Sequence, residues 1–381
     1  MVGINSSRNE IVKRQKIMYI IISLFAVVAL LSCCVIFSIK INNYSDDFST
    51  FSNNIASVNK NVSSSYAVME MDRNILLDGK NADCSLPMAS TTKVMTAYIA
   101  CLSGKLQDTV IIPKSAVGVE GSSIYVKEGE KYKLIDLVYG LMLQSGNDAA
   151  EAIALYLGGS IDGFAQLMNE QVQKLGLKNT HFVNPHGLHN DKHYTSAYDL
   201  AYITCEGLKN EDFAKICSTK IYKFQLETGE NKCYINKNKL LNLYDGCIGV
   251  KTGFTKKAGR CLVSAAKRNG VTIVSVVLNH GDMWNSSMAN LNRGFDKTQG
   301  VVIAKGNECF AKVKAPSGQI LNLGFNEDIT FSALKNEQIN ITYDIKLNKN
   351  LPELVQKGEI VGEIQFFNDK HLLFTKKIYT I

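Results

Sequence analysis

Apolar positions recur with two different periods along the chain, and the change of period divides it into regions. Strand-like runs at 66–71 and 75–77 flank the turn sequence Asp72-Arg73-Asn74, a pattern typical of a β-hairpin. Helical spacing governs the following apolar segments: 90–101, 134–143, 149–157, 160–175 and 196–208. Strand-like runs return at 221–226, 247–252, 260–266 and 271–278, and a closing helix is expected at 291–295. The pattern predicts a helix-rich middle that separates an early hairpin from later strands.

The pattern changes again after residue 300. Short alternating runs at 310–313, 339–347, 360–366 and 372–379 are separated by turn residues such as Pro316-Ser317-Gly318. We therefore expect a separate all-β domain at 301–381, which is within the usual size range of a domain.

The apolar run at 17–39 differs from the shorter apolar segments described above, because it is long, contains no charged residue and is bounded by Lys16 and Lys40. A helix of about 20 apolar residues spans a bilayer, and preceding basic residues keep the N-terminus cytoplasmic. We expect a cytoplasmic tail at 1–16, a transmembrane anchor at 17–39 and an Asn/Ser/Asp-rich linker at 40–61. A cleaved signal peptide, followed by secretion, is the alternative, although no A-x-A pattern follows the run.

Composition narrows the class of protein. The 381 residues are 46% hydrophobic and 20% charged, which is ordinary for a globular protein of two or more domains. The net charge is +7, but no basic stripe with interleaved aromatic residues predicts nucleic-acid binding. Ten cysteines are present without a C-x-x-C pair that would indicate zinc or redox chemistry. The sequence does not decide whether the cysteines form disulfides or stay reduced.

The first candidate chemistry lies at the start of the helical pattern near residue 90. Ser90 and Lys93 are three residues apart, and such positions share one helix face. An amine held in a desolvated pocket has a lowered pKa and can accept the proton of a serine hydroxyl. Ser90-x-x-Lys93 therefore supplies a nucleophile and its base, although a match of this length also occurs by chance as a helix cap.

Two further short motifs change this assessment. Ser145-Gly146-Asn147 lies in a predicted turn between helices, where a hydroxyl and an amide can relay a proton and bind a carbonyl. Lys251-Thr252-Gly253 lies on a predicted strand and offers a fixed cation and a hydroxyl donor to a carboxylate. Motifs of the types S-x-x-K, S-x-N and K-T-G, in this order, are typical of serine β-lactamases and penicillin-binding proteins.

Longer matches around these motifs resemble the low-molecular-mass penicillin-binding proteins, the D-alanyl-D-alanine carboxypeptidases of peptidase family S11. The matching stretches are 86–93, 139–150, 184–188 and 249–255. The resemblance covers residues 62 to about 298 and implies a β-lactamase/DD-peptidase-like catalytic domain of α/β (α+β) class. An antiparallel sheet flanked by helices, a helical subdomain and a small all-β C-terminal domain are expected.

The resemblance also implies the catalytic roles. Ser90 would attack the carbonyl between the last two D-alanines of a peptidoglycan stem peptide, with Lys93 as the base. Ser145 and Asn147 would assist proton transfer and hold the substrate amide. β-Lactam antibiotics would acylate the same serine and leave slowly, and no metal or other cofactor is expected.

Substrate binding is implied for Lys251, Thr252, Gly253 and Phe254. Lys251 and Thr252 would bind the terminal carboxylate, while the backbone N–H groups of Ser90 and Phe254 would form an oxyanion hole. Some family members carry an arginine downstream of K-T-G, but the corresponding region here, at 282–286, holds none. The sequence therefore leaves the details of carboxylate recognition open.

Three other interpretations remain to be compared. A serine β-lactamase requires a deacylating glutamate on a loop between S-x-N and K-T-G, but the loop here resembles the carboxypeptidases. A catalytically inactive, membrane-tethered wall-binding protein conflicts with three intact motifs. His186, His189, Asp191 and His193 resemble a metal cluster only in composition, because they lie in a Gly/Asn-rich loop without the spacing of a ligand set.

Overall fold

The computed structural model describes residues 64–381, and the predicted tail, anchor and linker all lie outside the described residues. In residues 64–381, no helix combines the length and apolar character needed to cross a bilayer.

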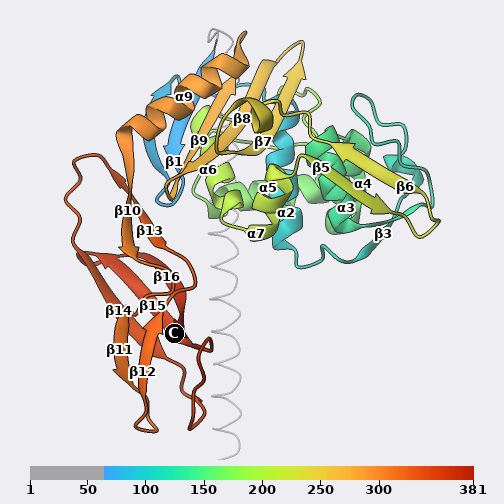
Figure 1. Ribbon diagram of the computed structural model, residues 1–381. Coiled ribbons are helices and arrows are strands. Elements are labelled where there is room, and N and C mark those ends of the chain that lie inside the picture. The colour runs from blue at the N-terminus through green and yellow to red at the C-terminus, as the bar shows by residue number, and fades with distance from the viewer. Residues whose placement is uncertain (1–63) are drawn as a thin grey trace, which may run out of the picture. The chain divides into compact units, whose positions relative to one another are not determined.

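A five-stranded antiparallel sheet organises the first domain (Figure 1). Its order is β2-β1-β9-β8-β7, so the early hairpin joins strands from almost 200 residues later. The strands are β1 (Ser65–Glu70), β2 (Ile75–Lys80), β7 (Cys247–Thr255), β8 (Gly259–Arg268) and β9 (Val271–Leu278). β7 lies at one edge, so within residues 64–381 one side of the Lys251-Thr252-Gly253 strand has no neighbouring strand.

Successive side chains of β9 point alternately to the two faces of this sheet and pack into two different hydrophobic cores. Val274 and Val276 belong to the large core formed with the helices of the middle region, while Ile273 and Val277 pack with Leu291. Leu291 belongs to α9 (Met283–Lys297), the closing helix that the sequence predicted, which covers this second face (Figure 1). Every residue of β9 is buried, as expected for a strand covered on both faces.

The helical subdomain follows the predicted pattern in most places. Its helices are α2 (Lys93–Leu102), α3 (Leu134–Tyr139), α4 (Asn147–Gly158), α5 (Ile161–Lys174), α6 (Ala197–Leu208), α7 (Glu211–Ser218) and α8 (Leu240–Leu243). Ser160 and Ser196 cap α5 and α6 by accepting hydrogen bonds from backbone N–H groups of the first turn. Two small hairpins complete the subdomain: β3 (Thr109–Ile111) with β4 (Lys131–Lys133), and β5 (Ile221–Gln225) with β6 (Asn231–Ile235).

The predicted helix at 134–143 is divided in two. α3 ends at Tyr139, and a π-helical turn, η3 (Gly140–Gln144), carries the chain to Ser145, which adopts a left-handed backbone conformation with φ of 65°. The wider winding of a π turn is frequent at functional sites.

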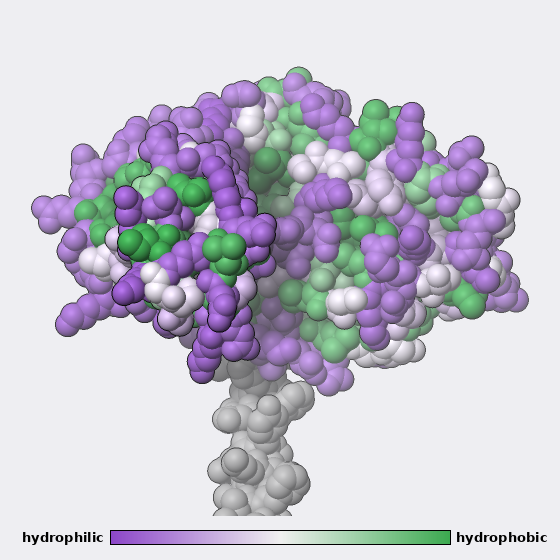
Figure 2. Space-filling view, turned by 60° about the horizontal axis from the view of Figure 1, so that its bottom comes forward, coloured by the Kyte–Doolittle hydropathy of each residue, from purple (hydrophilic) through white to green (hydrophobic). Residues whose placement is uncertain are grey.

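The all-β C-terminal domain is confirmed. β10 (Thr298–Ala304) pairs with β13 (Ile329–Leu334), and a second sheet has the order β11-β12-β16-β15-β14. The strands of this second sheet are β11 (Ala311–Lys314), β12 (Ile320–Gly324), β14 (Ile341–Leu347), β15 (Ile360–Asn368) and β16 (His371–Thr380). Buried Leu323, Phe325, Ile364 and Phe366 belong to a core that is separate from the catalytic one. Figure 2 shows exposed hydrophobic side chains as small separate groups among hydrophilic residues on the face that it presents.

Candidate active site

Ser90 lies in a single 3₁₀ turn, η1 (Ala89–Thr92), immediately before α2. The sequence analysis placed Ser90 in the first turn of an α-helix, so the position is right but the winding is tighter. Residues i and i+3 eclipse in a 3₁₀ turn, which brings the side chain of Lys93 to Ser90. The Lys93 Nζ atom is 3.2 Å from Ser90 Oγ.

Lys93 is completely buried, and its amine has two shorter contacts. Nζ lies 2.7 Å from Asn147 Oδ1 and 2.7 Å from the backbone carbonyl oxygen of His186. Burial, and then the nearby ammonium of Lys251, lower the pKa of Lys93 well below its ordinary value. A neutral amine has two hydrogens and one lone pair. In the neutral form, which this pKa shift favours, the two close acceptors take the two hydrogens and the lone pair is available to the Ser90 hydroxyl.

The Ser145–Asn147 turn joins the π turn to α4, of which Asn147 is the first residue. The second hydrogen-bonding group of Asn147, Nδ2, donates to the carbonyl of Glu120, so the amide orientation is fixed from both ends. Ser145 is buried beside it, but in residues 64–381 its hydroxyl makes no hydrogen bond with Ser90 or Lys93. The structure thus links Ser90, Lys93 and Asn147 directly, and Ser145 lies two residues before Asn147 in the chain.

Strand β7 brings the third motif to the same place. Lys251 is buried, and burial followed by the charge of Lys237 lowers the pKa of Lys251 to about 7. At Gly253 a Cβ atom would lie 3.1 Å from the backbone nitrogen of Ser90, so β7 passes directly beside the nucleophile. Thr252 is half-buried, and Phe254 is 65% exposed at the rim.

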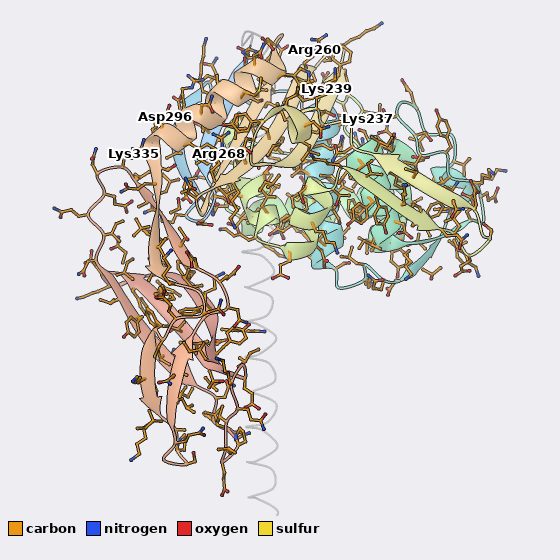
Figure 3. The ribbon with its side chains drawn as sticks, in the orientation of Figure 1. Lys237, Lys239, Arg260, Arg268, Asp296 and Lys335 are labelled. Carbon is orange, nitrogen blue, oxygen red and sulfur yellow. The ribbon has the colours of Figure 1, made fainter. Side chains whose placement is uncertain are left out.

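Lys237 is a cation that the sequence analysis missed. It lies between β6 and α8 (Figure 3), and its Nζ donates to the carbonyl of Gln144 at 2.7 Å, next to Ser145. The charge of Lys237 also contributes to the lowered pKa values of Lys93 and Lys251. No local pattern surrounds this lysine, since its proximity to the site depends on the packing of the loop after β6.

The histidine-rich loop contributes structure to the site. His193 Nε2 lies 2.8 Å from Thr92 Oγ1, and His193 Nδ1 accepts a hydrogen bond from the Val183 N–H. Burial lowers the pKa of His193 to about 3, so its ring is neutral. Across residues 64–381, no group of three or more histidine, cysteine, aspartate or glutamate side chains is arranged to hold a metal ion.

Cys261 is a core residue of β8, with a thiol pKa that burial raises to about 12. A thiol of this kind is not a nucleophile at neutral pH. All eight cysteines in the part of the chain that the structure describes are free thiols.

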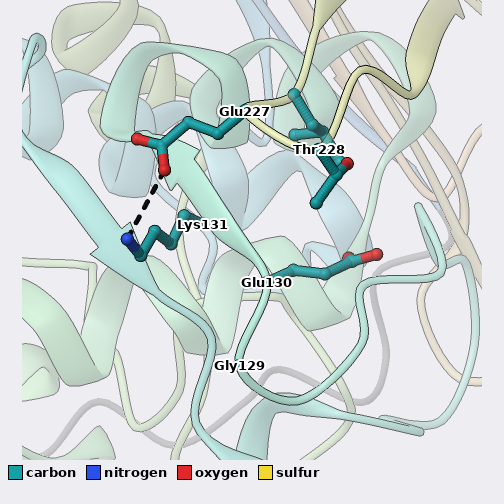
Figure 4. Close-up of a pocket in the computed structure, with 6 residues that line it drawn as sticks. Gly129, Glu130, Lys131, Glu227 and Thr228 are labelled. Carbon is teal, nitrogen blue, oxygen red and sulfur yellow. Dashed lines mark ion pairs between the residues drawn. The ribbon is translucent and has the colours of Figure 1, made fainter.

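A shallow pocket of about 330 Å³ lies elsewhere, between the turn before β4 and the β5–β6 turn (Figure 4). It is lined by Gly129, Glu130, Lys131, Leu226, Glu227 and Thr228. Its Lys131–Glu227 ion pair, at 3.4 Å, is largely exposed, and none of its lining residues belongs to the site described above.

A serine beside a buried lysine amine, with an amide and a cationic edge strand around them, is the arrangement typical of the penicillin-recognising class of proteins. The comparisons with known proteins agree. The family model for D-alanyl-D-alanine carboxypeptidase (Peptidase_S11) matches residues 52–282, and the model for the penicillin-binding protein 5 C-terminal domain matches residues 299–381. The chain therefore belongs to the D-alanyl-D-alanine carboxypeptidase family.

Two curated relatives match most of the chain. The chain is 33% identical to D-alanyl-D-alanine carboxypeptidase DacF of Bacillus subtilis over 320 residues, which are 81% of this chain and 82% of that protein. It is also 33% identical to DacA of Escherichia coli K12, over 79% of this chain and 78% of the relative.

Solved structures extend the likeness to the fold. The D-alanyl-D-alanine carboxypeptidase DacD from Francisella tularensis has a TM-score of 0.59 at 26% identity, covering 86% of this chain and 94% of that one. A mutant of the Streptomyces K15 DD-transpeptidase has a TM-score of 0.58 at 33% identity, covering 64% of this chain and 99% of that one.

Proposed function

We propose that this D-alanyl-D-alanine carboxypeptidase removes the terminal D-alanine of peptidoglycan stem pentapeptides through an acyl-enzyme on Ser90. The observation that carries the proposal is the arrangement around Lys93 Nζ, which lies 3.2 Å from Ser90 Oγ and donates hydrogen bonds to two other acceptors at 2.7 Å. Lys93 takes the hydroxyl proton while Ser90 Oγ bonds to the carbonyl carbon. The tetrahedral intermediate then breaks the C–N bond, and the departing amine of D-alanine receives a proton.

The backbone N–H groups of Ser90 and Phe254 stabilise the oxyanion of that intermediate. The close passage of β7 at Gly253 supports this role, because it brings the following N–H group near the nucleophile. One oxyanion-hole donor contributes about 3–4 kcal/mol of transition-state stabilisation in a comparable enzyme.

Lys251 and Thr252 bind the terminal carboxylate, and Ser145 and Asn147 relay the proton and hold the substrate amide. Lys237 adds positive charge to the same region. A carboxylate next to Lys251 favours the ammonium form of that lysine, which counteracts the effect of burial on its pKa. Water then hydrolyses the acyl-enzyme, and β-lactams acylate the same serine.

Fluorescent penicillin labelling of the purified protein tests the nucleophile. Wild type should acquire one stable label and release D-alanine from a pentapeptide, whereas Ser90→Ala should do neither, because no hydroxyl remains to form the ester. Ser103→Ala, a matched change at the far end of α2, should label as wild type does. Equal labelling of wild type and Ser90→Ala would refute the assignment.

We also propose that residues 17–39 anchor the enzyme with its catalytic domain on the outer face of the cell membrane. The support is the uncharged apolar run and its basic flank. Fractionation of cells that express the full chain should leave the enzyme in the membrane pellet after a carbonate wash at high pH. Release into the supernatant or the medium would instead favour cleavage of the segment.

A further inference from the structure

Glu151 lies one helical turn beyond Asn147 on α4, so the two side chains share a face. The Glu151 carboxylate is only 20% exposed, and burial raises its pKa above the ordinary value. In the part of the chain that the structure describes, its side chain has one polar partner, the ring of His186, with Glu151 Oε1 3.4 Å from His186 Nε2. Burial of an acid is unfavourable unless it is compensated, so this contact requires an explanation.

The protonation state of His186 follows from its other contacts. The backbone N–H of Leu188 donates to His186 Nδ1 at 3.2 Å, so Nδ1 carries no proton. Burial lowers the pKa of His186 to about 3, so the ring is neutral. The single ring proton is therefore on Nε2, the ring atom that lies 3.4 Å from Glu151 Oε1.

The backbone of His186 is what touches the catalytic amine, since its carbonyl oxygen accepts a hydrogen bond from Lys93 Nζ at 2.7 Å. Asn184 holds the same turn from the other side by accepting from the N–H groups of His186 and Gly187. A carbonyl that moved from this place would no longer take one of the two amine hydrogens, and the lone pair of Lys93 would lose its direction.

We propose that Glu151 is a positioning residue: through its 3.4 Å contact with His186 Nε2, it holds the His186 carbonyl that accepts a hydrogen bond from Lys93 Nζ. The inference rests on the proposed function of Ser90 and Lys93 and adds a residue to it. Glu151 lies on a helix and faces the imidazole. It therefore does not match the loop glutamate that a β-lactamase would use for deacylation.

The test compares three substitutions in the purified protein. Glu151→Gln keeps an oxygen acceptor of the same length and should acylate with fluorescent penicillin within about threefold of wild type, because the ring donor is neutral. Glu151→Ala removes the acceptor, and Glu151→Asp withdraws it by one methylene. Both should lower the acylation rate constant and the kcat of D-alanine release about 10- to 100-fold, with KM nearly unchanged, because misplacement by about 1 Å costs this much.

Glu170→Ala, on the neighbouring helix α5, is the matched control and should leave both rates unchanged. Thermal unfolding of each variant identifies loss of structure, and Glu151→Gln remains informative if the shorter side chains destabilise the fold.

Normal rates in Glu151→Ala would overturn the proposal, as would a raised KM alone, which indicates contact with substrate. Normal acylation with blocked deacylation in Glu151→Gln would also overturn it, because the acid would then be a base. A wild-type protein that is not labelled at Ser90 refutes the proposed function instead, which keeps the two failures distinct.

Discussion

Lys93 and Lys251 both place an amine in the protein interior, and burial lowers the pKa of each. Lys93 requires a lowered pKa for its role as base, because an ammonium has no lone pair to accept the serine proton. For Lys251 the consequence is different, since a pKa of about 7 makes its charge depend on pH near neutrality. The same burial that prepares the base therefore has a cost in folding stability.

That cost has a definite sign for Lys251. Its pKa is about 7 in the folded chain and about 10.4 when unfolded, so between these values the unfolded chain binds more protons. The free energy of unfolding therefore rises with pH in this window, by up to about 1.4 kcal/mol per pH unit from this residue. Below pH 7 both states are protonated, and the slope from Lys251 disappears.

Replacement of Lys251 by methionine should remove its part of this slope. We expect the difference in unfolding free energy between Lys251→Met and wild type to change by about 1 kcal/mol per unit between roughly pH 8 and 9.5, as measured by urea titration at several pH values. The exposed Lys256→Met provides the control and should follow the wild-type slope. Parallel slopes for Lys251→Met and wild type would contradict the prediction.

Some residues of the site could be predicted from the sequence, and others could not. Ser90, Lys93 and Asn147 belong to short motifs, and the structure brings them within hydrogen-bonding distance. Lys237 and Glu151 belong to no motif, because each acts through a partner far away in the chain and only the folded backbone brings the partners together.

At the scale of elements, the loop that carries His186 is held against the η1 turn at a point where no side chain fits. Gly187 has φ of 92°, and a Cβ atom there would overlap the carbonyl group of Ala89, the residue before the nucleophile. The backbones of the loop and of the serine turn are in direct contact at this position. The spacing between the catalytic serine and the carbonyl on Lys93 therefore depends on a glycine.

Gly187→Ala should separate the two segments. We expect it to reduce penicillin acylation at least about 100-fold and to destabilise the fold by more than about 3 kcal/mol, because backbone overlap is added to left-handed strain. Gly176→Ala has a similar φ of 70° but nothing within 4 Å of the new methyl group, so it should cost only about 1–2 kcal/mol and keep activity. Acylation kinetics and thermal unfolding of the pair measure the difference, and equal effects would show that strain alone matters.

Most elements could be predicted from periodicity, and the exceptions have physical reasons. Strand β9 was predicted with its observed bounds, because eight successive apolar or small residues leave little ambiguity. The eight-residue helix α7 was missed, since its buried residues, Phe213, Ile216 and Cys217, span too few turns to establish a period. The end of α3 was misplaced because the π turn after Tyr139 is determined by packing, with Gly140 lying against the side chain of Ile124.

At the scale of the whole molecule, the side chain of Arg73 makes one of the contacts between the two domains. Arg73, in the β1–β2 turn, donates two hydrogen bonds to Glu337, at 2.7 and 3.0 Å, and lies 5.0 Å from the ring centre of Phe331 on β13. The side chains of Arg73 and Glu337 are only 19% and 21% exposed, so solvent screens the pair less than a surface salt bridge. Glu70 accepts hydrogen bonds from the backbone of the same turn and orders it from within the catalytic domain.

Arg73→Ala should therefore weaken the energetic coupling between the domains and leave catalytic activity unchanged. We expect calorimetry to show the less stable domain unfolding at least about 5 °C earlier and as a separate transition, while D-alanine release from a soluble pentapeptide stays within about twofold. Arg293→Ala, whose ion pair with Asp78 lies inside the catalytic domain, is the control and should not separate the transitions. An unchanged single transition in Arg73→Ala would assign the coupling to other contacts.

The groups that surround Ser90 come from segments that lie far apart in the sequence. Its amine neighbour comes from α2, the amide from α4, the carbonyl from the loop at 184–188 and the glycine beside it from β7, some 160 residues later. An incompletely folded polypeptide therefore exposes Ser90 as an ordinary, unreactive hydroxyl. Reactivity toward an antibiotic arises only when the last strand of this set has docked. Pulses of fluorescent penicillin at successive times during refolding would measure when that strand docks.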